Sequence, residues 1–326
     1  MKKILYVTNM YPTVDNPFFG IFIKEQIDAV KKHYKFHEEI YLINGSYKSK
    51  FEYLKSIFVV PYLIMKRKPD IIHIHYGISG LFLLIYKPNI PIYLTLHGSD
   101  FLDYGSNRLQ VWISKIIVKK VNQIFVQNQE MKNLGHIINP NTVILTCGVD
   151  TAFFNPGDSK SLSFDSKVVI FPSNSEREEK NYALFLKVID RIEITLREKV
   201  IIKCIDKMNR IEIRDLLSSA NCLLMTSISE GSPQVVKEAL SCGLPVVSVP
   251  VGNVGEMIEG VPNCYMSSTF HVDELCFLVL KSLSGKKDGI RERFIEKNIY
   301  DNNHIATRLA DFYKIHKSSV VNAVDL

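Results

Sequence analysis

The sequence of 326 residues lacks the features that mark exported, membrane-spanning and disulfide- or zinc-stabilised proteins. No two of its six cysteines form a Cys-x-x-Cys pair, and no histidine cluster accompanies them. Cysteines used in this way, several of them inside apolar runs, are typical of reduced core thiols in a cytoplasmic protein. No uninterrupted apolar stretch reaches the roughly 18–20 residues that a membrane span needs. The first apolar run ends at Thr8 and Asn9, too early for a signal peptide, so we expect a cytoplasmic protein.

Low-complexity tracts and short repeats are also lacking, and 46% hydrophobic with 23% charged residues is an ordinary globular composition. Acidic residues are scarce only in the first half of the chain. Residues 1–157 hold 18 Lys and Arg against 11 Asp and Glu, whereas residues 158–326 hold 22 against 23. This excess of positive charge predicts an anionic surface or substrate on the first half. No aromatic-rich recognition motif accompanies it, so nucleic acid is not an expected partner.

Short β-branched runs alternate with segments of helical period, and the chain is long enough for two domains. This alternation predicts an α/β protein whose parallel sheets are covered on both faces. The Pro156-Gly157 pair predicts a linker. We therefore expect one domain in residues 1–157, a second in 158–301, and a C-terminal helical segment in 302–326 that packs back on the first. The expected strands are Lys3–Thr8, Glu39–Ile43, Asp70–His75, Pro91–Leu96, Gln123–Val126, Thr142–Leu145, Lys167–Phe171, Lys199–Ile205, Cys222–Thr226 and Pro245–Val249.

The strongest local pattern lies in residues 226–238, where an apolar strand runs into a helix. Ser232 suits the N-cap of this helix and Pro233 its first position. The backbone N–H groups that follow, together with the helix dipole, predict a site for an anion, most naturally a phosphate. Glu230 precedes the helix and Glu238 lies about two turns along it, and carboxylates accept hydrogen bonds from paired sugar hydroxyls. On spacing alone, a capped helix with two solvated glutamates is an equal alternative.

Residues 229–248, with the sequence SEGSPQVVKEALSCGLPVVS, resemble the signature of retaining GT-B glycosyltransferases of family 4. That signature has two glutamates separated by seven residues, then Glu-Ala and Gly-x-Pro-Val-Val. The segment VGNVGE at 251–256 resembles the glycine-containing loop and Glu that follow it. The resemblance extends more weakly over nearly the whole chain. It implies a GT-B fold of two facing Rossmann-like doubly wound domains with an interdomain cleft, donor binding mainly by the second domain, and no obligatory metal or other cofactor.

Carried over residue by residue, the resemblance assigns roles in this segment. It implies that Glu238 holds the ribose hydroxyls of the donor and that Glu230 contacts the donor sugar near the reacting carbon. The residues whose backbone it implies to line the sugar and diphosphate are Gly231, Ser232, Pro233, Gln234 and Val235.

The loop FPSNSEREEKN at 171–181 follows the first strand of the second domain. The family usually has Gly-Arg and then Lys-Gly here, and Arg177 and Lys180 resemble that basic pair. The resemblance implies that the pair neutralises the leaving diphosphate, on which charge develops as the glycosidic bond breaks. Ser173 or Ser175 replaces the family's Gly, and Arg177 is displaced along the loop. Because three glutamates surround the two bases, a solvated charged loop is the alternative.

Three features of the first domain complete the predicted site. His97, in the segment His-Gly-Ser-Asp, is implied to lie in the cleft near a donor-sugar hydroxyl and the acceptor, with Asp100 orienting its loop. Gly20 opens a helix and permits close approach to a bound sugar or diphosphate. His73 and His75 face one side of a strand, and we favour a structural role over acceptor contact. A metal site on these two histidines lacks a third ligand nearby.

Residues 51–68 mix aromatic, apolar and basic residues at helical spacing. Such a helix binds anionic lipid. A packed crossover helix with a solvated basic rim is at least as good an interpretation. The basic residues at its ends are Lys48, Lys50, Lys55, Lys66, Arg67 and Lys68.

Together these features predict transfer of a sugar from a nucleotide diphospho-sugar, by family frequency a UDP-sugar, to a hydroxyl of a glycan or lipid-linked glycan. Surface polysaccharide synthesis is the expected setting, at the inner face of the cell membrane, with an anionic membrane surface as a further partner. A sugar-nucleotide 2-epimerase-like GT-B enzyme and a non-catalytic sugar-nucleotide-binding partner are the alternatives. The sequence specifies neither the base, sugar and acceptor nor the linkage.

Overall fold

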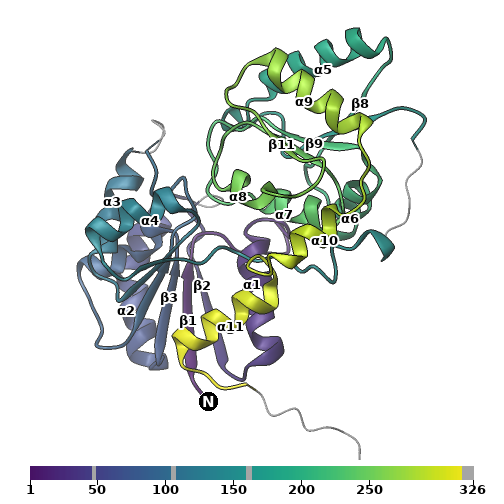
Figure 1. The fold of residues 1–326 in the computed structure, drawn as a ribbon. Coiled ribbons are helices and arrows are strands. Elements are labelled where there is room, and N and C mark those ends of the chain that lie inside the picture. Colours follow the sequence, from purple (N-terminus) through teal and green to yellow (C-terminus); the bar gives the residue numbers. More distant parts are fainter. Residues whose placement is uncertain (46–48, 104–107, 159–163, 318–326) are drawn as a thin grey trace, which may run out of the picture. The chain divides into compact units, whose positions relative to one another are not determined.

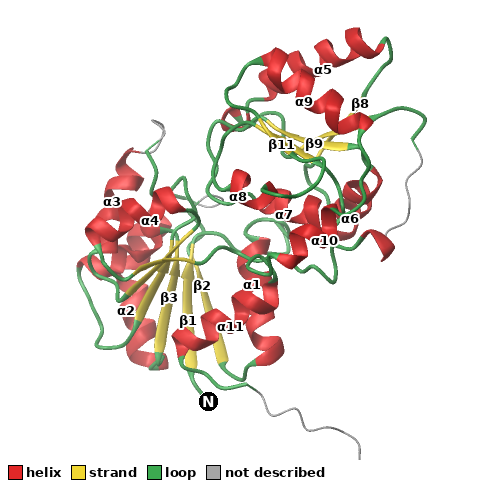
Figure 2. Cartoon of the chain, viewed as in Figure 1, coloured by secondary structure: helices red, strands yellow, loops and turns green. Residues whose placement is uncertain are grey.

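The computed structural model describes residues 1–45, 49–103, 108–158 and 164–317. The chain divides into two compact units, one formed by Met1–Thr146 with the segment from Asn302 onward, and one by Cys147–Asp301. Each unit is built on one parallel sheet flanked by helices (Figures 1 and 2). This confirms the predicted α/β class with two Rossmann-like domains.

The described part of the first unit has a parallel sheet in the order β2-β1-β3-β4-β5-β6. Side chains alternate between its faces, since Ile4 and Tyr6 belong to one buried cluster and Leu5 and Val7 to another. Helices α1 and α11 cover the first face, and α2, η1 and α3 pack over the second (Figure 1). The elements are β1 (Lys3–Thr8), α1 (Ile21–His33), β2 (His37–Leu42), α2 (Phe51–Arg67), β3 (Ile71–His75), the 3₁₀ helix η1 (Gly77–Leu84), β4 (Ile92–Thr95), α3 (Arg108–Val118), β5 (Gln123–Val126), α4 (Gln129–Ile138), β6 (Thr142–Ile144) and α11 (Asn302–Tyr313).

The second unit has a parallel sheet in the order β11-β10-β9-β7-β8 over its described residues. Helices α5 and α9 pack together on one face, and α6, α7 and α10 lie on the other (Figure 2). The elements are η2 (Pro156–Asp158), β7 (Val168–Phe171), η3 (Glu178–Lys180), α5 (Tyr182–Leu196), β8 (Ile201–Cys204), α6 (Arg210–Ser219), β9 (Cys222–Met225), α7 (Gln234–Ser241), β10 (Val246–Ser248), α8 (Val254–Ile258), β11 (Tyr265–Met266), α9 (Val272–Ser284) and α10 (Ile290–Glu296).

In each sheet the direction of winding reverses beside the first strand. β1 lies between β2 and β3, and β7 lies between β8 and β9. Open parallel sheets bind ligands outside the carboxyl ends of the strands at this switch point, because the two loops diverge there. In the second unit the loops at the switch point follow β7 and β9, which are the two segments that carry the predicted basic pair and Glu230.

The units divide at Thr146 and Cys147, eleven residues before the predicted linker at Gly157. The segment after Cys147 packs into the second unit, whose core includes Val149 and Phe154. The backbone N–H of Val149 also donates to the Tyr300 carbonyl at 2.8 Å. The Pro-Gly pair therefore marks a turn inside the second unit, because apolar side chains upstream of it are already buried there.

The C-terminal helix α11 lies beside α1 in the first unit (Figure 1). Tyr313 at its end is 1% exposed, and its hydroxyl is hydrogen-bonded to His73 Nδ1 and accepts from the Tyr6 hydroxyl at 3.3 Å. Lys2 Nζ donates to the Tyr313 carbonyl at 2.8 Å. The last helix thus closes one face of the first sheet, while residues 318–326 of the predicted segment lie outside the described residues.

Replacing Tyr313 by Ala is expected to lower the free energy of unfolding of the first unit by about 3–5 kcal/mol, because a large buried side chain is lost. Tyr62 on α2 is 55% exposed. Tyr62→Ala is therefore the matched control, expected to stay within about 0.5 kcal/mol of wild type. Urea unfolding followed by circular dichroism measures both variants. Equal midpoints for the two would contradict the docking of α11.

Candidate functional site

Hydrogen bonds join the loop after β7 to the loop after β9. The Ile228 N–H donates to the Glu179 carbonyl at 2.9 Å, and the Thr226 hydroxyl donates to the Lys180 carbonyl at 3.0 Å. These bonds place the Lys180 ammonium against Oε1 of Glu230, and both side chains are 12% exposed. Two residues fifty positions apart, each predicted for the site, therefore meet at the switch point of the second sheet.

Arg177, the other member of the predicted basic pair, does not join this contact. Its guanidinium is bound to Oε1 of Glu179, and its side chain is 54% exposed. Lys180 and Arg177 thus differ in surroundings, one held beside Glu230 and the other at the surface of the same loop.

A glycine of the 251–256 loop packs directly on the Glu230 segment. Gly252 has φ +54°, and a Cβ on it would lie 2.7 Å from the Gly231 carbonyl oxygen and 3.0 Å from that of Glu230. Both the positive φ and the close approach require glycine here. The loop at 251–256 therefore packs against the backbone of the Glu230–Gly231 segment and supports it.

Helix α7 begins at Gln234 with Pro233 as its N-cap, so the prediction of Ser232 as N-cap and Pro233 as first helical residue is wrong by one position. Pro233 has the φ of a helix, −63°, but its ψ of 120° is extended, which delays the first turn. The Ser232 hydroxyl is buried and has no hydrogen-bond partner among the described residues. Buried polar atoms of this kind are usually satisfied, so this hydroxyl fits a site that takes a polar ligand.

Glu238, in the middle of α7, is 3% exposed and forms an ion pair with Arg210. The distance from its Oε1 to Nη2 of Arg210 is 2.8 Å. Sequence reasoning missed Arg210. The signal for it was the Asn-x-x-Glu pattern at 209–212, which is typical of a helix start and forms a complete capping box. That box places Arg210 at the first position of α6, just after β8.

Two further side chains of α7 fasten it to the start of the second unit, and the sequence did not reveal this either. Gln234 Nε2 donates to the Gly148 carbonyl at 2.6 Å, and Lys237 Nζ donates to the Cys147 carbonyl at 2.6 Å. Lys237 is fully buried, and burial lowers its pKa to about 8. Lys237, which precedes the predicted ribose-binding residue Glu238, therefore has a structural role.

In the first unit, the buried carboxylate of Asp100 holds the loop that carries His97 in place through hydrogen bonds. Its Oδ1 accepts from the N–H groups of His97 at 2.9 Å and Gly98 at 3.0 Å, and its Oδ2 accepts from that of Gly77 at 3.1 Å. Burial raises the pKa of Asp100 to about 6, against the lowering effect of these hydrogen bonds. The residue ties the loop after β4 to the loop after β3, which is the orienting role predicted for it.

His97 lies within a set of aromatic rings at the ends of β3 and β4. Its Nε2 is 3.2 Å from Nδ1 of His75, and the Tyr76 ring stacks on it with centroids 4.5 Å apart. Tyr76 has φ +67°, a conformation that costs of order 1–3 kcal/mol for a residue with a side chain. His75 is fully buried, and burial lowers its pKa to about 3, so its ring is neutral. The strained backbone of Tyr76 thus keeps its ring stacked on His97, whose Nε2 also contacts His75.

Gly20 sits at the start of α1 with φ +71°. A Cβ on it would lie 2.6 Å from the carbonyl carbon of Met10 in its own loop. The loop conformation alone therefore requires glycine at this position.

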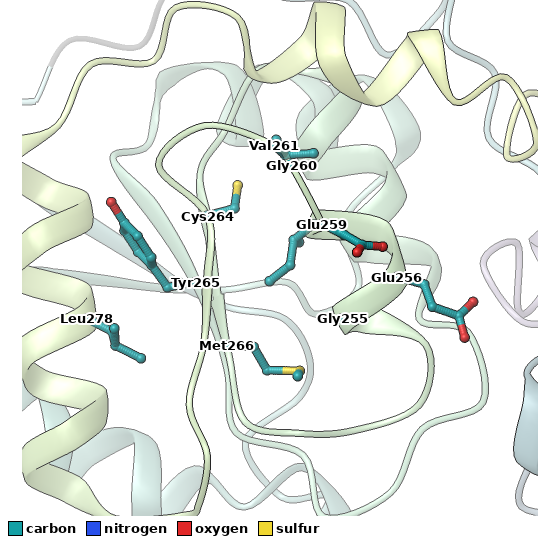
Figure 3. A pocket seen from close by; sticks show the side chains of 10 residues that line it. Gly255, Glu256, Glu259, Gly260, Val261, Cys264, Tyr265, Met266 and Leu278 are labelled. Atoms are coloured by element: carbon teal, nitrogen blue, oxygen red, sulfur yellow. The ribbon is translucent and has the colours of Figure 1, made fainter.

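A separate cavity of about 550 Å³ lies beside α8 and the edge strand β11 (Figure 3). None of the site residues predicted from the sequence lines it. Because β11 is at the far edge of the sheet from β7, this cavity is distinct from the loops at the switch point. Its lining residues are Gly255, Glu256, Ile258, Glu259, Gly260, Val261, Cys264, Tyr265, Met266 and Leu278.

Two family models match the chain. Residues 23–128 match the model described as glycosyl transferase 4-like, and residues 195–280 match the model described as glycosyl transferases group 1. The first match lies in the first unit and the second match in the second unit. The chain therefore belongs to the GT-B glycosyltransferases of the group 1 and family 4-like type.

Known proteins similar to the chain agree with this family. The chain is 22% identical to TuaC of Bacillus subtilis, named as a glycosyltransferase of teichuronic acid biosynthesis, over 78% of this chain and 82% of that protein. It is 25% identical to the N-acetyl-alpha-D-glucosaminyl L-malate synthase of Bacillus anthracis, over 58% of this chain and 59% of that protein. The structure of Anabaena HepE in complex with UDP-glucose has a TM-score of 0.71 at 14% identity, over 96% of this chain and 100% of that chain. The last likeness shows the fold.

None of the helices formed by the described residues is long and apolar enough to cross a bilayer. The described residues also contain no group of three His, Cys, Asp or Glu side chains that could hold a metal ion.

Replacing His75 by Asn is expected to make the stability of the protein less sensitive to acid. The unfolded chain takes up a proton on this histidine near pH 6.5, whereas the folded chain does so only near pH 3. Protons therefore favour the unfolded state, and stability that is present above pH 6.5 is lost as the pH falls toward 3. The loss is about 1.4 kcal/mol per pH unit, or roughly 2 kcal/mol between pH 6.5 and 5.

Urea unfolding at pH 7, 6 and 5 measures this slope. His136→Asn, at an exposed position of the same unit, is the control and should keep the wild-type slope. An unchanged slope in His75→Asn would show that His75 is not held neutral in the folded state.

Proposed function

We propose that the chain is a retaining glycosyltransferase that moves a sugar from a nucleotide diphospho-sugar, by default a UDP-sugar, to a hydroxyl of a glycan or lipid-linked glycan in surface polysaccharide synthesis. The contact between Lys180 and Glu230 at the switch point of the second sheet carries the proposal. The name of TuaC supports the product class, and the UDP-glucose complex of HepE supports the donor.

In the proposed reaction the bond between the anomeric carbon and the phosphate oxygen breaks, and its electron pair stays on the phosphate. Lys180 is placed to neutralise this charge, with the more exposed Arg177 as a second cation. The first N–H groups of α7, from Gln234 on, add the positive end of a helix dipole. The acceptor oxygen bonds to the anomeric carbon on the face that the phosphate leaves, and its proton passes to the departing phosphate oxygen. These groups act without a metal in this proposal.

The remaining assigned residues hold the donor and acceptor. Glu230 contacts the donor sugar near the reacting carbon, and its carboxylate is paired with the Lys180 ammonium. Glu238 accepts hydrogen bonds from the ribose hydroxyls. In the first unit, His97 contacts a sugar hydroxyl and the acceptor, and Gly20 leaves room for the diphosphate or sugar. The backbone that lines the sugar and diphosphate belongs to Gly231, Ser232, Pro233, Gln234 and Val235.

The proposal distinguishes the two glutamates by their kinetic effects. Glu238→Ala is expected to weaken donor binding about tenfold or more, because a charged acceptor for the ribose is lost while the reacting centre is unchanged. Glu230→Ala is expected to lower turnover by roughly 100-fold or more, because its contact lies at the reacting carbon. Donor affinity and turnover are measured with the best donor from a nucleotide-sugar panel, in EDTA and in Mn²⁺.

Glu176 is exposed in the loop after β7, and Glu176→Ala is the control. Its donor affinity and turnover should equal those of wild type. Wild-type affinity and turnover in all three variants would refute the donor site. Complete loss of wild-type activity in EDTA with rescue by Mn²⁺ would refute the metal-free chemistry alone.

A membrane-associated acceptor is the second part of the proposal, and helix α2 supports it. One face of α2 packs on the core through Val60 and Ile64, so the expectation of a packed crossover helix is met. The opposite face carries a stripe of large apolar side chains at three- and four-residue spacing, with basic residues at its C-terminal end. Such a face suits an anionic lipid surface. The exposed apolar residues are Phe51, Leu54, Phe58, Tyr62 and Met65; Lys48 lies outside the described residues.

Replacing Lys66, Arg67 and Lys68 together by Gln is expected to reduce binding to anionic vesicles by about 100-fold at low salt, since each basic residue contributes about 1 kcal/mol. Sedimentation with phosphatidylglycerol-containing vesicles at low and high salt measures it, and high salt should weaken wild-type binding. The matched control replaces Lys31, Lys32 and Lys35, which are exposed in and after α1, by Gln. If wild type does not bind such vesicles at low salt, the membrane-associated acceptor is contradicted and the basic residues of α2 are only a solvated face.

A further inference from the structure

Arg210 lies against the carboxylate that the proposed function assigns to the donor ribose. Its Nη2 is 2.8 Å from Oε1 of Glu238, and the two side chains are 20% and 4% exposed. A carboxylate buried to this degree stays charged where a fixed cation replaces the water that it has lost. Arg210 supplies that cation, so the direction of the Glu238 carboxylate depends on it.

The helix that carries Arg210 does not explain its position. Arg210 is the first residue of α6, after the capping box of Asn209 and Glu212. A positive charge at this end of a helix faces the positive end of the dipole, which is unfavourable. The guanidinium lies instead over the ring of Phe154, 4.6 Å from the ring centroid, and Phe154 is 1% exposed. This cation–π contact with a buried ring restricts where the guanidinium can lie and hence the side from which it meets Glu238.

We propose that Arg210 is a positioning residue that holds Glu238 in the orientation needed for the 2′- and 3′-hydroxyls of the donor ribose. The site would thereby select ribonucleotides over 2′-deoxyribonucleotides. This inference rests on the proposed role of Glu238. The contact between Arg210 and Oε1 is an ion pair without a hydrogen bond, and no described residue donates a hydrogen bond to this buried oxygen, so Oε1 can still accept from the ribose. A hydroxyl bound by a fixed, charged acceptor gains more affinity than one bound by a mobile acceptor, so the selection depends on Arg210 even when Glu238 is present.

The test compares UDP with 2′-deoxy-UDP as probes in isothermal titration calorimetry. Wild type is expected to bind UDP about tenfold more tightly than 2′-deoxy-UDP. In Arg210→Ala this ratio is expected to fall to about one, mainly through weaker binding of UDP. Arg210→Lys restores the charge without the planar fork and should give an intermediate ratio.

Arg214→Ala is the matched control. Arg214 lies one turn later on α6, with its guanidinium carbon 5.2 Å from the Phe153 ring centroid and its Nη2 2.9 Å from Asp215. It repeats the surroundings of Arg210 but pairs with a different carboxylate, so its variant is expected to keep the wild-type ratio. A general effect of disturbing α6 would instead lower both ratios. If Arg210→Ala does not fold, Arg210→Lys decides, and a wild-type ratio in it overturns the inference.

Glu238→Ala separates the inference from the function on which it rests. If Glu238→Ala abolishes the preference for UDP while the Arg210 variants keep it, the role of Arg210 is overturned and the donor site stands. If wild type shows no preference, or Glu238→Ala keeps it, the ribose role of Glu238 fails and the inference fails with it. If wild type binds none of UDP, ADP and GDP, the proposed function itself is contradicted.

Discussion

Every strand in the two described sheets runs parallel to its neighbours, and the remaining features depend on this constraint. Parallel strands collect all their carboxyl ends at one edge, and the reversal of winding beside the first strand opens a gap between two loops there. In the second unit this brings Lys180 and Glu230 together although fifty residues separate them. Ile228 and Thr226 donate hydrogen bonds to the carbonyls of Glu179 and Lys180, and these bonds join the loop after β9 to the loop after β7. The Lys180 ammonium and the Glu230 carboxylate are therefore held side by side.

Much of this arrangement could be predicted because its signals are local. β-branched runs of four to seven residues between helical segments predict every strand of the two described sheets except β11, a two-residue strand at the edge of the second sheet. Glu230, Glu238 and the Gly-Leu-Pro-Val-Val run that follows lie close together in the sequence. The structure places the two glutamates on the loop and helix after β9, and the run leads from α7 into β10. The orienting role of Asp100 could also be predicted, because the backbone N–H groups of His97 and Gly98 lie within its reach along the chain.

What could not be predicted depends on contacts between distant segments. The second unit begins at Cys147 rather than at residue 158, because Val149 and Phe154 are buried in the core of the second unit. The local sequence around these two residues does not indicate in which of the two cores they are buried. Arg210 was missed for the same reason, since its partner Glu238 lies beyond an entire strand and loop. Arg177 and Lys180 look equivalent in the sequence, but only Lys180 is drawn inward, because Thr226 and Ile228 bind the end of its loop.

The central claim is that the second unit binds a nucleotide diphospho-sugar at the contact between Lys180 and Glu230. Differential scanning fluorimetry with UDP-glucose, UDP-N-acetylglucosamine, ADP-glucose and GDP-mannose tests it most directly, since a ligand at 100 times its Kd adds about 2.7 kcal/mol of stability. At least one of these donors should raise the Tm of wild type, and Lys180→Ala should remove most of that shift. A wild type that none of the four stabilises, or a shift that is the same in Lys180→Ala, would contradict the claim.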